Sequence, residues 1–169
     1  MRFGYYSGWR KGEISRIEWR DVQDVVIRLR PEVSKNKDGR VLALVGEVAD
    51  IIARRRAVQD AASPYVFHRQ GKPVKDFRKA WRNACHQAGI PTGAHHGRVF
   101  HDLRRTTARN LSRADVPDRI AMSIMGHKTR AMYDRYNIVD EEDIRRGMRR
   151  AEDYLTEEGD NRVTVSEKE

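Results

Sequence analysis

What this sequence of 169 residues lacks already limits what the protein can be. Cys85 is its only cysteine, which excludes a disulfide framework within the chain and is typical of a reducing compartment. No apolar run approaches the roughly 20 residues that a membrane-spanning helix needs, and the N-terminus has no secretory apolar segment. We therefore expect a cytoplasmic protein that does not contact membranes.

Several patterns that mark catalytic or cofactor sites are missing as well. The sequence has neither the Gly-x-Ser-x-Gly elbow of serine hydrolases nor a glycine-rich loop for nucleotide phosphates. The residues that could bind zinc occur in neither Cys-x-x-Cys nor His-Glu-x-x-His spacing; they are Cys85, His95, His96, His101 and His127. We therefore expect no metal site and no cofactor.

Positive charge is abundant, and it is unevenly distributed. The formal net charge is +9, with 35% charged and 38% hydrophobic residues. Residues 1–136 carry 28 basic and 14 acidic side chains, whereas residues 137–169 carry 6 and 11. A basic body of this kind favours a polyanionic partner such as nucleic acid. The alternative is that Lys and Arg only solvate the outer faces of helices.

Apolar periodicity and capping residues predict a mixed α+β fold that is predominantly helical. Helices are predicted over residues 13–19, 46–58, 74–88, 101–113, 116–125 and 129–135, and a last one begins near residue 140. Gly126 suits the end of the fifth of these helices. Cys85 shares an apolar stripe with Phe77 and Trp81, so we interpret it as a core residue.

Two β-rich segments, residues 24–30 and 41–44, are separated by turn-forming residues and predict a small antiparallel hairpin. Lysines stand near its tip. They can protect the edge of the sheet, which is the more common meaning of this pattern, or reach into a DNA groove.

We expect one domain over residues 1–155 and an acidic, flexible tail over residues 156–169. The opening residues 3–8 have the pattern of an apolar helix that ends in a turn. We therefore expect the first helix of the domain to be truncated.

One set of polar residues suggests chemistry on a phosphate. His101 and Arg104 are three residues apart on a predicted helix and share a face. His127 follows the end of a later helix, and Tyr136 comes nine residues after it. Arg10 precedes a helix, where the dipole disfavours a cation, so it is either an ordinary exposed residue or one kept for a function.

These motifs, in this order, resemble the catalytic domain of the tyrosine recombinases, the phage integrase family. Residues 7–13 look like the first box of the family, and residues 34–41 look like the hairpin that carries its lysine. Residues 101–106 match the His-x-x-Arg box, and Gly126-His127 with Tyr136 matches the last box. The resemblance covers about residues 3–150. It implies the tyrosine recombinase catalytic-domain fold.

The resemblance also implies a reaction that breaks and rejoins DNA through a 3′-phosphotyrosyl link without a metal. The catalytic residues that it implies are Arg10, Lys35, His101, Arg104, His127 and Tyr136. Two arginines would clamp the phosphate oxygens, the histidines would add hydrogen bonds, the lysine would protonate the 5′ oxygen and the tyrosine would attack. Glu13 would support the site from behind.

Two of these assignments have close alternatives, because Tyr133 also follows His127 and Lys37 shares the hairpin with Lys35. The spacing within the family favours Tyr136 and Lys35. We expect Tyr133 to be a packing residue.

The partners that the resemblance implies are double-stranded DNA, further copies of the chain in a tetramer on DNA, and host DNA-bending proteins. Lys37, Arg40 and Arg105 are the predicted DNA-binding residues. The helix from about residue 140 would contact another protomer or pack on its own domain. We expect the core-binding domain that precedes the catalytic domain in the family to have no counterpart in this sequence. Two alternatives remain: a DNA-binding remnant without catalysis, and a type IB topoisomerase-like enzyme that relaxes DNA.

Overall fold

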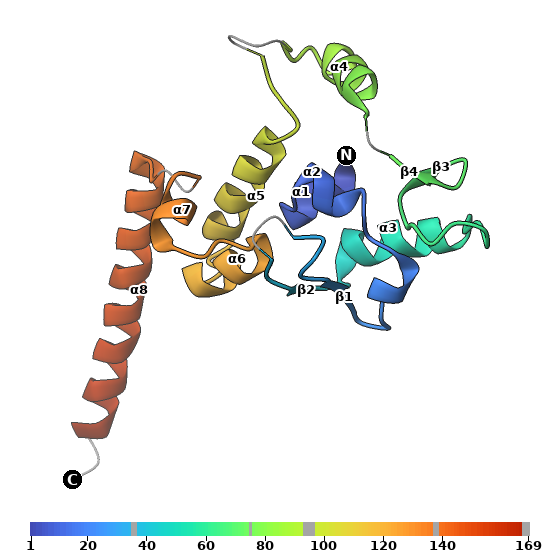
Figure 1. The fold of residues 1–169 in the computed structure, drawn as a ribbon. Coiled ribbons are helices and arrows are strands. Elements are labelled where there is room, and N and C mark those ends of the chain that lie inside the picture. Colours follow the sequence, from blue (N-terminus) through green and yellow to red (C-terminus); the bar gives the residue numbers. More distant parts are fainter. Residues whose placement is uncertain (35–36, 75, 93–96, 137–138, 167–169) are drawn as a thin grey trace. The chain divides into compact units, whose positions relative to one another are not determined.

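Figure 1 shows the computed structural model of the chain, which describes residues 1–34, 37–74, 76–92, 97–136 and 139–166. The elements, in order, are α1 (Arg2–Ser7), α2 (Lys11–Ile14), the 3-10 turn η1 (Trp19–Asp21), β1 (Val26–Leu29), β2 (Arg40–Ala43), α3 (Gly46–Arg56), β3 (His68–Arg69), β4 (Lys72–Pro73), α4 (Arg78–Gln87), α5 (Asp102–Arg113), α6 (Asp118–Met125), α7 (Arg130–Asp134) and α8 (Glu141–Ser166). The chain forms two compact units, Met1–Asn137 and Ile138–Glu169. Helices dominate, as predicted.

The first unit begins with two short helices joined by a left-handed glycine. Gly8 ends α1 with a φ of 62°, and its N–H donates to the Gly4 carbonyl. Because this turn is tight, α2 starts only three residues later, with Arg10 as its N-cap. The predicted helix over residues 13–19 is shorter than expected.

That helix ends early because the chain pairs with a distant segment. Trp19 N donates to the Pro64 carbonyl at 2.8 Å, and Val66 N donates to the Ile17 carbonyl at 2.9 Å. Backbone groups used in this way cannot continue a helix.

The predicted hairpin is confirmed. Strands β1 and β2 pair in antiparallel fashion with Leu29 opposite Arg40, and Ile27, Leu29 and Leu42 are buried. Strand β2 lies beside α6, as Figure 1 shows. The hairpin therefore carries Arg40 to the region where α6 ends.

The larger core packs α1, the hairpin and α3 together. Its buried residues are Phe3, Trp9, Ile17, Ile27, Leu29, Val33, Leu42, Val48, Ile51, Ile52 and Val66. A second cluster between α5, α6 and α7 contains Ala108, Ala121, Met125 and Tyr133, with Tyr136 packed against it. Tyr133 is fully buried, in agreement with the packing role predicted for it.

The segment between α3 and α5 differs most from the prediction. Strands β3 and β4 form a second small hairpin that we did not predict, because each has only two residues. Helix α4 starts at Arg78 and not near residue 74. Phe77, its N-cap, packs against Phe100 with ring centroids 4.8 Å apart, and Trp81 lies 5.7 Å from the same ring.

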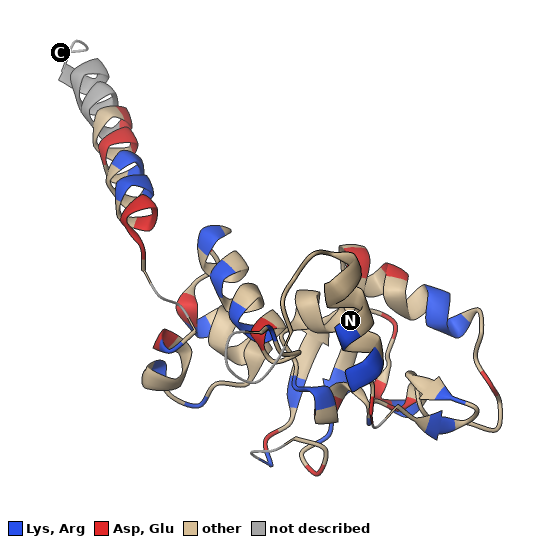
Figure 2. Ribbon diagram, turned by 90° about the horizontal axis from the view of Figure 1, so that it is seen from above, with Lys and Arg blue, Asp and Glu red and all other residues tan. Residues whose placement is uncertain are grey.

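The second unit contains α8, which continues to Ser166, past the point where we expected a flexible tail. Its first turn is acidic, which the helix dipole favours, and basic residues and then further acidic residues follow along the helix (Figure 2). Among the described residues, no helix is long and apolar enough to cross a membrane.

Candidate active site

Five separate segments of the first unit meet around Arg104. They are the start of α2 with Arg10 and Glu13, strand β2 with Arg40, the start of α5 with His101, the turn after α6 with His127, and the residues after α7 with Tyr136. The predicted acid Lys35 lies outside the described residues, as do His95 and His96.

Arg104 is a cation held between the ends of two helices. Its side chain is 2% exposed, and its two Nη atoms donate to the carbonyls of Gly8 and Met125, each at 2.5 Å. Gly8 caps α1 and Met125 is the last residue of α6, so both partially negative helix ends face the guanidinium group. The two left-handed glycines, Gly8 and Gly126, turn the chain sharply where these carbonyls end their helices.

The charge of Arg104 is only partly compensated. Burial, followed by the positive charges of Arg10 and Arg40, lowers the pKa of Arg104 to about 10, and the negative charge of Glu13 offsets only part of this. The Nε–H group of Arg104 is buried without a partner among the described residues. Because a guanidinium group has five N–H donors and two bind carbonyls, donors remain for an anion.

Glu13 organises the two other arginines. Its Oε1 accepts from Arg10 Nη1 at 3.1 Å, and its Oε2 accepts from the Arg10 backbone N at 2.8 Å and from Arg40 Nη2. Glu13 is 2% exposed. Burial alone would raise the pKa of its carboxyl, but the hydrogen bonds and charges of Arg40 and Arg10 bring the pKa below its ordinary value.

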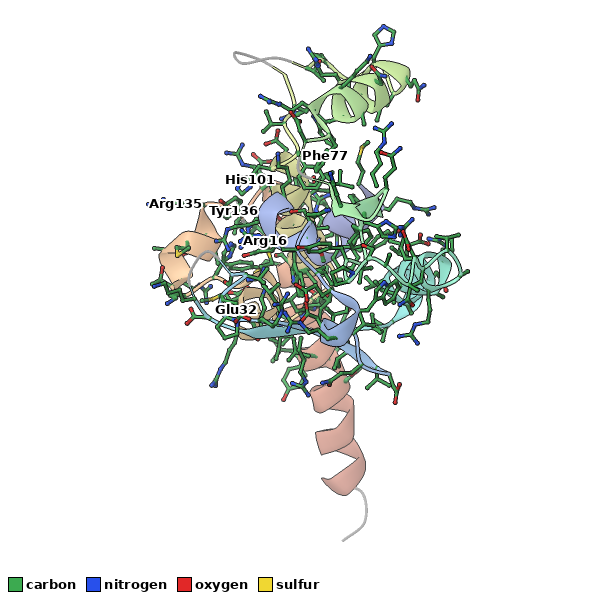
Figure 3. All side chains as sticks on the ribbon, turned by 45° about the vertical axis from the view of Figure 1, so that its right-hand side comes forward. Arg16, Glu32, Phe77, His101, Arg135 and Tyr136 are labelled. Atoms are coloured by element: carbon green, nitrogen blue, oxygen red, sulfur yellow. The ribbon has the colours of Figure 1, made fainter. Side chains whose placement is uncertain are left out.

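Tyr136 lies between two histidines. Its hydroxyl oxygen is 3.0 Å from His101 Nε2, and its ring stacks on the His127 ring with centroids 5.1 Å apart and planes 16° from parallel. Figure 3 shows His101 and Tyr136 side by side. The Arg104 guanidinium carbon is 5.9 Å from the centre of the same tyrosine ring.

Both histidines favour the neutral form. Burial, followed by the charges of Arg104 and Arg10, lowers the pKa of His127 to about 4 and also lowers the pKa of His101. His127 is 7% exposed, and neither ring nitrogen has a partner among the described residues. At neutral pH, His127 therefore offers one N–H donor and one acceptor to whatever enters the site.

The three predicted DNA-binding residues differ in their positions. Lys37 and Arg105 are exposed. The Nη1 atom of Arg105 lies 3.6 Å from Oδ1 of Asp102. Arg40 is buried, with its side chain 6% exposed. Arg40 therefore lies below the surface beside Glu13, and its contact with DNA stays a prediction.

Sequence reasoning also missed the support below the arginines. Trp9 is 1% exposed, and its Nε1 donates to the Ile124 carbonyl at 3.1 Å. The guanidinium carbon of Arg40 lies over the Trp9 ring, 4.9 Å from the ring centre. Alternation along β2 offered a signal for Arg40, because residues 40 and 42 share a face and Leu42 is buried.

Residues 1–143 match the phage integrase family, whose members are tyrosine recombinases. The chain belongs to this family. This confirms the family relationship that the motifs indicated.

A curated relative and several solved structures agree with the family. The integrase of Salmonella phage P22 is 28% identical over 150 residues, which are 80% of this chain and 37% of that protein. XerA recombinase has a TM-score of 0.70 at 22% identity, over 87% of this chain and 54% of that one. A lambda integrase tetramer bound to a Holliday junction has a TM-score of 0.65 at 17% identity, over 80% and 40%.

These solved structures show that the family's catalytic-domain fold is present. The chain spans 37% of the length of the P22 integrase and 54% of XerA. The match is therefore to one part of these longer proteins.

Proposed function

We propose that this chain is the catalytic part of a site-specific recombinase that cuts and rejoins DNA through a 3′-phosphotyrosyl intermediate. Tyr136 is the nucleophile, and Arg10, Arg104, His101 and His127 bind the phosphate that it attacks. The observation that carries the proposal is the position of the Tyr136 hydroxyl, 3.0 Å from His101 Nε2 and beside the buried charge of Arg104.

The charges of the site suit a phosphodiester. Arg10, Arg40 and Arg104 contribute three permanent positive charges, and Glu13 contributes one negative charge. Guanidinium groups bind phosphate oxygens through paired N–H donors and stabilise the charge that develops there during transfer. Arg10 is 19% exposed, so its guanidinium group is within reach of DNA at the surface.

The proton and bond changes can be followed atom by atom. Tyr136 Oη forms a bond to phosphorus as the bond to the 5′ oxygen breaks, which leaves a 3′-phosphotyrosyl link. The tyrosine hydroxyl loses its proton, and neutral His101 at 3.0 Å is placed to accept it. The 5′ oxygen gains a proton, which the family resemblance assigns to Lys35.

The surface of the first unit supports DNA as the substrate. Arg105 is exposed one residue after Arg104, and Lys37 is exposed in the hairpin. On α4, Lys79 and Arg82 line a hollow of about 930 Å³ together with Arg98. Such groups add sequence-independent attraction to the phosphate backbone.

We also propose that the chain acts as an oligomer on DNA. Lambda integrase has been solved as a dimer on a core site and as a tetramer on a Holliday junction. In the second unit, α8 exposes apolar side chains, which are Ile144, Met148, Tyr154 and Leu155. Contact with another protomer would cover them.

A nicked suicide substrate tests the proposal, because loss of a short 5′ fragment traps the phosphotyrosyl link. Duplexes with candidate attachment sites are incubated with the protein, and covalent protein–DNA species are separated on a denaturing gel. A trapped adduct supports the proposal. Binding without an adduct indicates a DNA-binding remnant, and relaxation of arbitrary supercoiled plasmids indicates topoisomerase-like activity. Either of these results contradicts the proposal.

A further inference from the structure

Arg40 has a position that neither the phosphate contacts nor the DNA surface explains. It is the first residue of β2 and faces inward with Leu42. Its guanidinium group lies against the Trp9 ring and pairs with Glu13. It also crowds Gly126, where a Cβ atom would lie 3.0 Å from the Arg40 Cζ.

The hydrogen bonds around Glu13 show what this arrangement does. Arg40 Nη2 and the Arg10 backbone N both bind Glu13 Oε2, and Arg40 Nη1 lies 3.4 Å from Oε1. Only one side-chain bond joins Arg10 to Glu13, from Nη1 to Oε1 at 3.1 Å. Most of the N–H donors of Arg10 therefore stay available.

Without Arg40, Arg10 would be the one cation among the described residues whose side chain is hydrogen-bonded to this carboxylate, with the charge of Arg104 acting on it without a hydrogen bond. Arginine and carboxylate groups readily form two parallel N–H···O bonds. Glu13 would then pair with Arg10 through both oxygens and neutralise it. A neutralised Arg10 would bind an incoming phosphate weakly.

We propose that Arg40 is a positioning residue, which occupies Glu13 so that the guanidinium group of Arg10 stays free to bind the phosphate of DNA. This inference rests on the proposed function for the role of Arg10. Arg40 acts through Glu13 and does not itself touch DNA.

The position of Arg40 also links three parts of the site. It stands where the hairpin turn ends, packs against Trp9 in the segment of residues 7–13, and contacts Gly126, which precedes His127. A displacement of β2 would therefore release Glu13 to Arg10.

A rescue experiment separates this role from a structural one. Arg40→Met is expected to slow covalent adduct formation about ten- to a hundredfold, because Glu13 then neutralises Arg10. Glu13→Gln in the same chain removes that negative charge, so the double variant is expected to be faster than Arg40→Met alone. Arg54→Met, which removes an exposed arginine from α3, serves as the matched control and keeps the wild-type rate.

The rescue result decides between the explanations. If the double variant is slower than either single variant, Arg40 acts on DNA or on the fold directly and the proposal is overturned. Should Arg40→Met not fold, Arg40→Lys carries the same comparison. A single ammonium group leaves one Glu13 oxygen to Arg10, so a smaller loss that Glu13→Gln reverses is expected.

A second measurement needs no DNA and remains decisive if the wild-type protein forms no adduct. The Glu13 carboxyl is titrated by carbon NMR in the wild-type protein and in the Arg40 variant. The charged groups that face it are Arg10 from α2, Arg40 from β2 and Arg104 from α5. Loss of Arg40 is expected to raise the pKa of Glu13 by about one unit or more. An unchanged pKa overturns the proposal, whereas a missing wild-type adduct overturns only the proposed function.

Discussion

The Nε2 atom of His101 lies 3.0 Å from the hydroxyl oxygen of Tyr136. These residues are 35 positions apart, and the contact joins the start of α5 to the segment that follows α7. Stacking on His127 fixes the tyrosine ring from another side. In the proposed reaction, the hydroxyl group would thus face its proton acceptor before the substrate binds, which would reduce the reorganisation that the reaction requires.

Arg104 should be important for folding as well as for chemistry. Arg104→Met removes the donors of two buried helix-end carbonyls, so we expect the free energy of unfolding to fall by about 3 kcal/mol. Urea unfolding measures the change. Arg105→Met is the control, because Arg105 is exposed and its loss should change stability by less than about 0.5 kcal/mol. Equal losses of stability in the two variants would contradict a stabilising role for the hydrogen bonds from Arg104 to the two helix ends.

His127 should make the fold sensitive to acid. Its pKa is about 4 in the folded protein and near 6.5 in an unfolded chain. Between these values the unfolded chain binds a proton that the folded protein does not, so stability falls as the pH drops from 6.5 to 4. The loss attributable to His127 approaches about 3 kcal/mol below pH 4.

Urea unfolding of His127→Gln across this pH range tests whether stability falls in acid and whether His127 causes the fall. We expect a smaller acid-dependent loss in the variant, with His101 and Glu13 accounting for part of what remains. His86→Gln changes an exposed histidine on α4, so its free energy of unfolding should depend on pH as in the wild-type protein. If the free energy of unfolding of His127→Gln depended on pH as in the wild-type protein, this histidine would not be held neutral in the fold.

Alanine variants at two left-handed glycines, Gly89 and Gly126, separate the effect of backbone strain from the effect of crowding at the site. Gly89 and Gly126 have φ values of 66° and 69°, so alanine at either position should cost about 1 kcal/mol of stability. An added Cβ meets nothing within 4 Å at Gly89 but meets the Arg40 guanidinium group at Gly126. We expect Gly126→Ala to lose more stability than Gly89→Ala, because the clash adds to the strain, and only Gly126→Ala to cleave DNA more slowly. A matching loss of cleavage in Gly89→Ala would refute this distinction.

Cleavage should continue in excess chelator. The permanent charges of Arg10 and Arg104 can compensate the phosphate oxygens without a divalent ion. Adduct yield on the suicide substrate is measured with and without EDTA, at constant ionic strength because phosphate contacts are salt-dependent. A strict requirement for a divalent ion would rule out the proposed mechanism.

Much of the site follows from local geometry that the sequence displays. Helical spacing places His101 and Arg104 on one face, and both reach Tyr136. Gly126 ends α6 at the expected residue, which brings His127 into the site. The hairpin strands also follow from their β-branched residues, since such residues favour a half-buried strand.

The remaining features depend on contacts between distant segments. Pairing with residues 64–66 shortens the helix expected at residues 13–19, and the Phe77–Phe100 contact delays the start of α4. The inward position of Arg40 depends on the register of β2 against β1 and on the Trp9 surface beneath it. No spacing within one segment predicts that Glu13 meets both Arg10 and Arg40.

The most direct test is to identify the residue that carries DNA after cleavage. The trapped adduct is digested with nuclease and protease, and the peptide that bears a nucleotide is sequenced by mass spectrometry. We expect the nucleotide on Tyr136, no adduct but unchanged DNA binding in Tyr136→Phe, and an adduct in Tyr133→Phe, provided that this buried position still folds. A nucleotide on Tyr133, or on any residue other than Tyr136, would contradict the account.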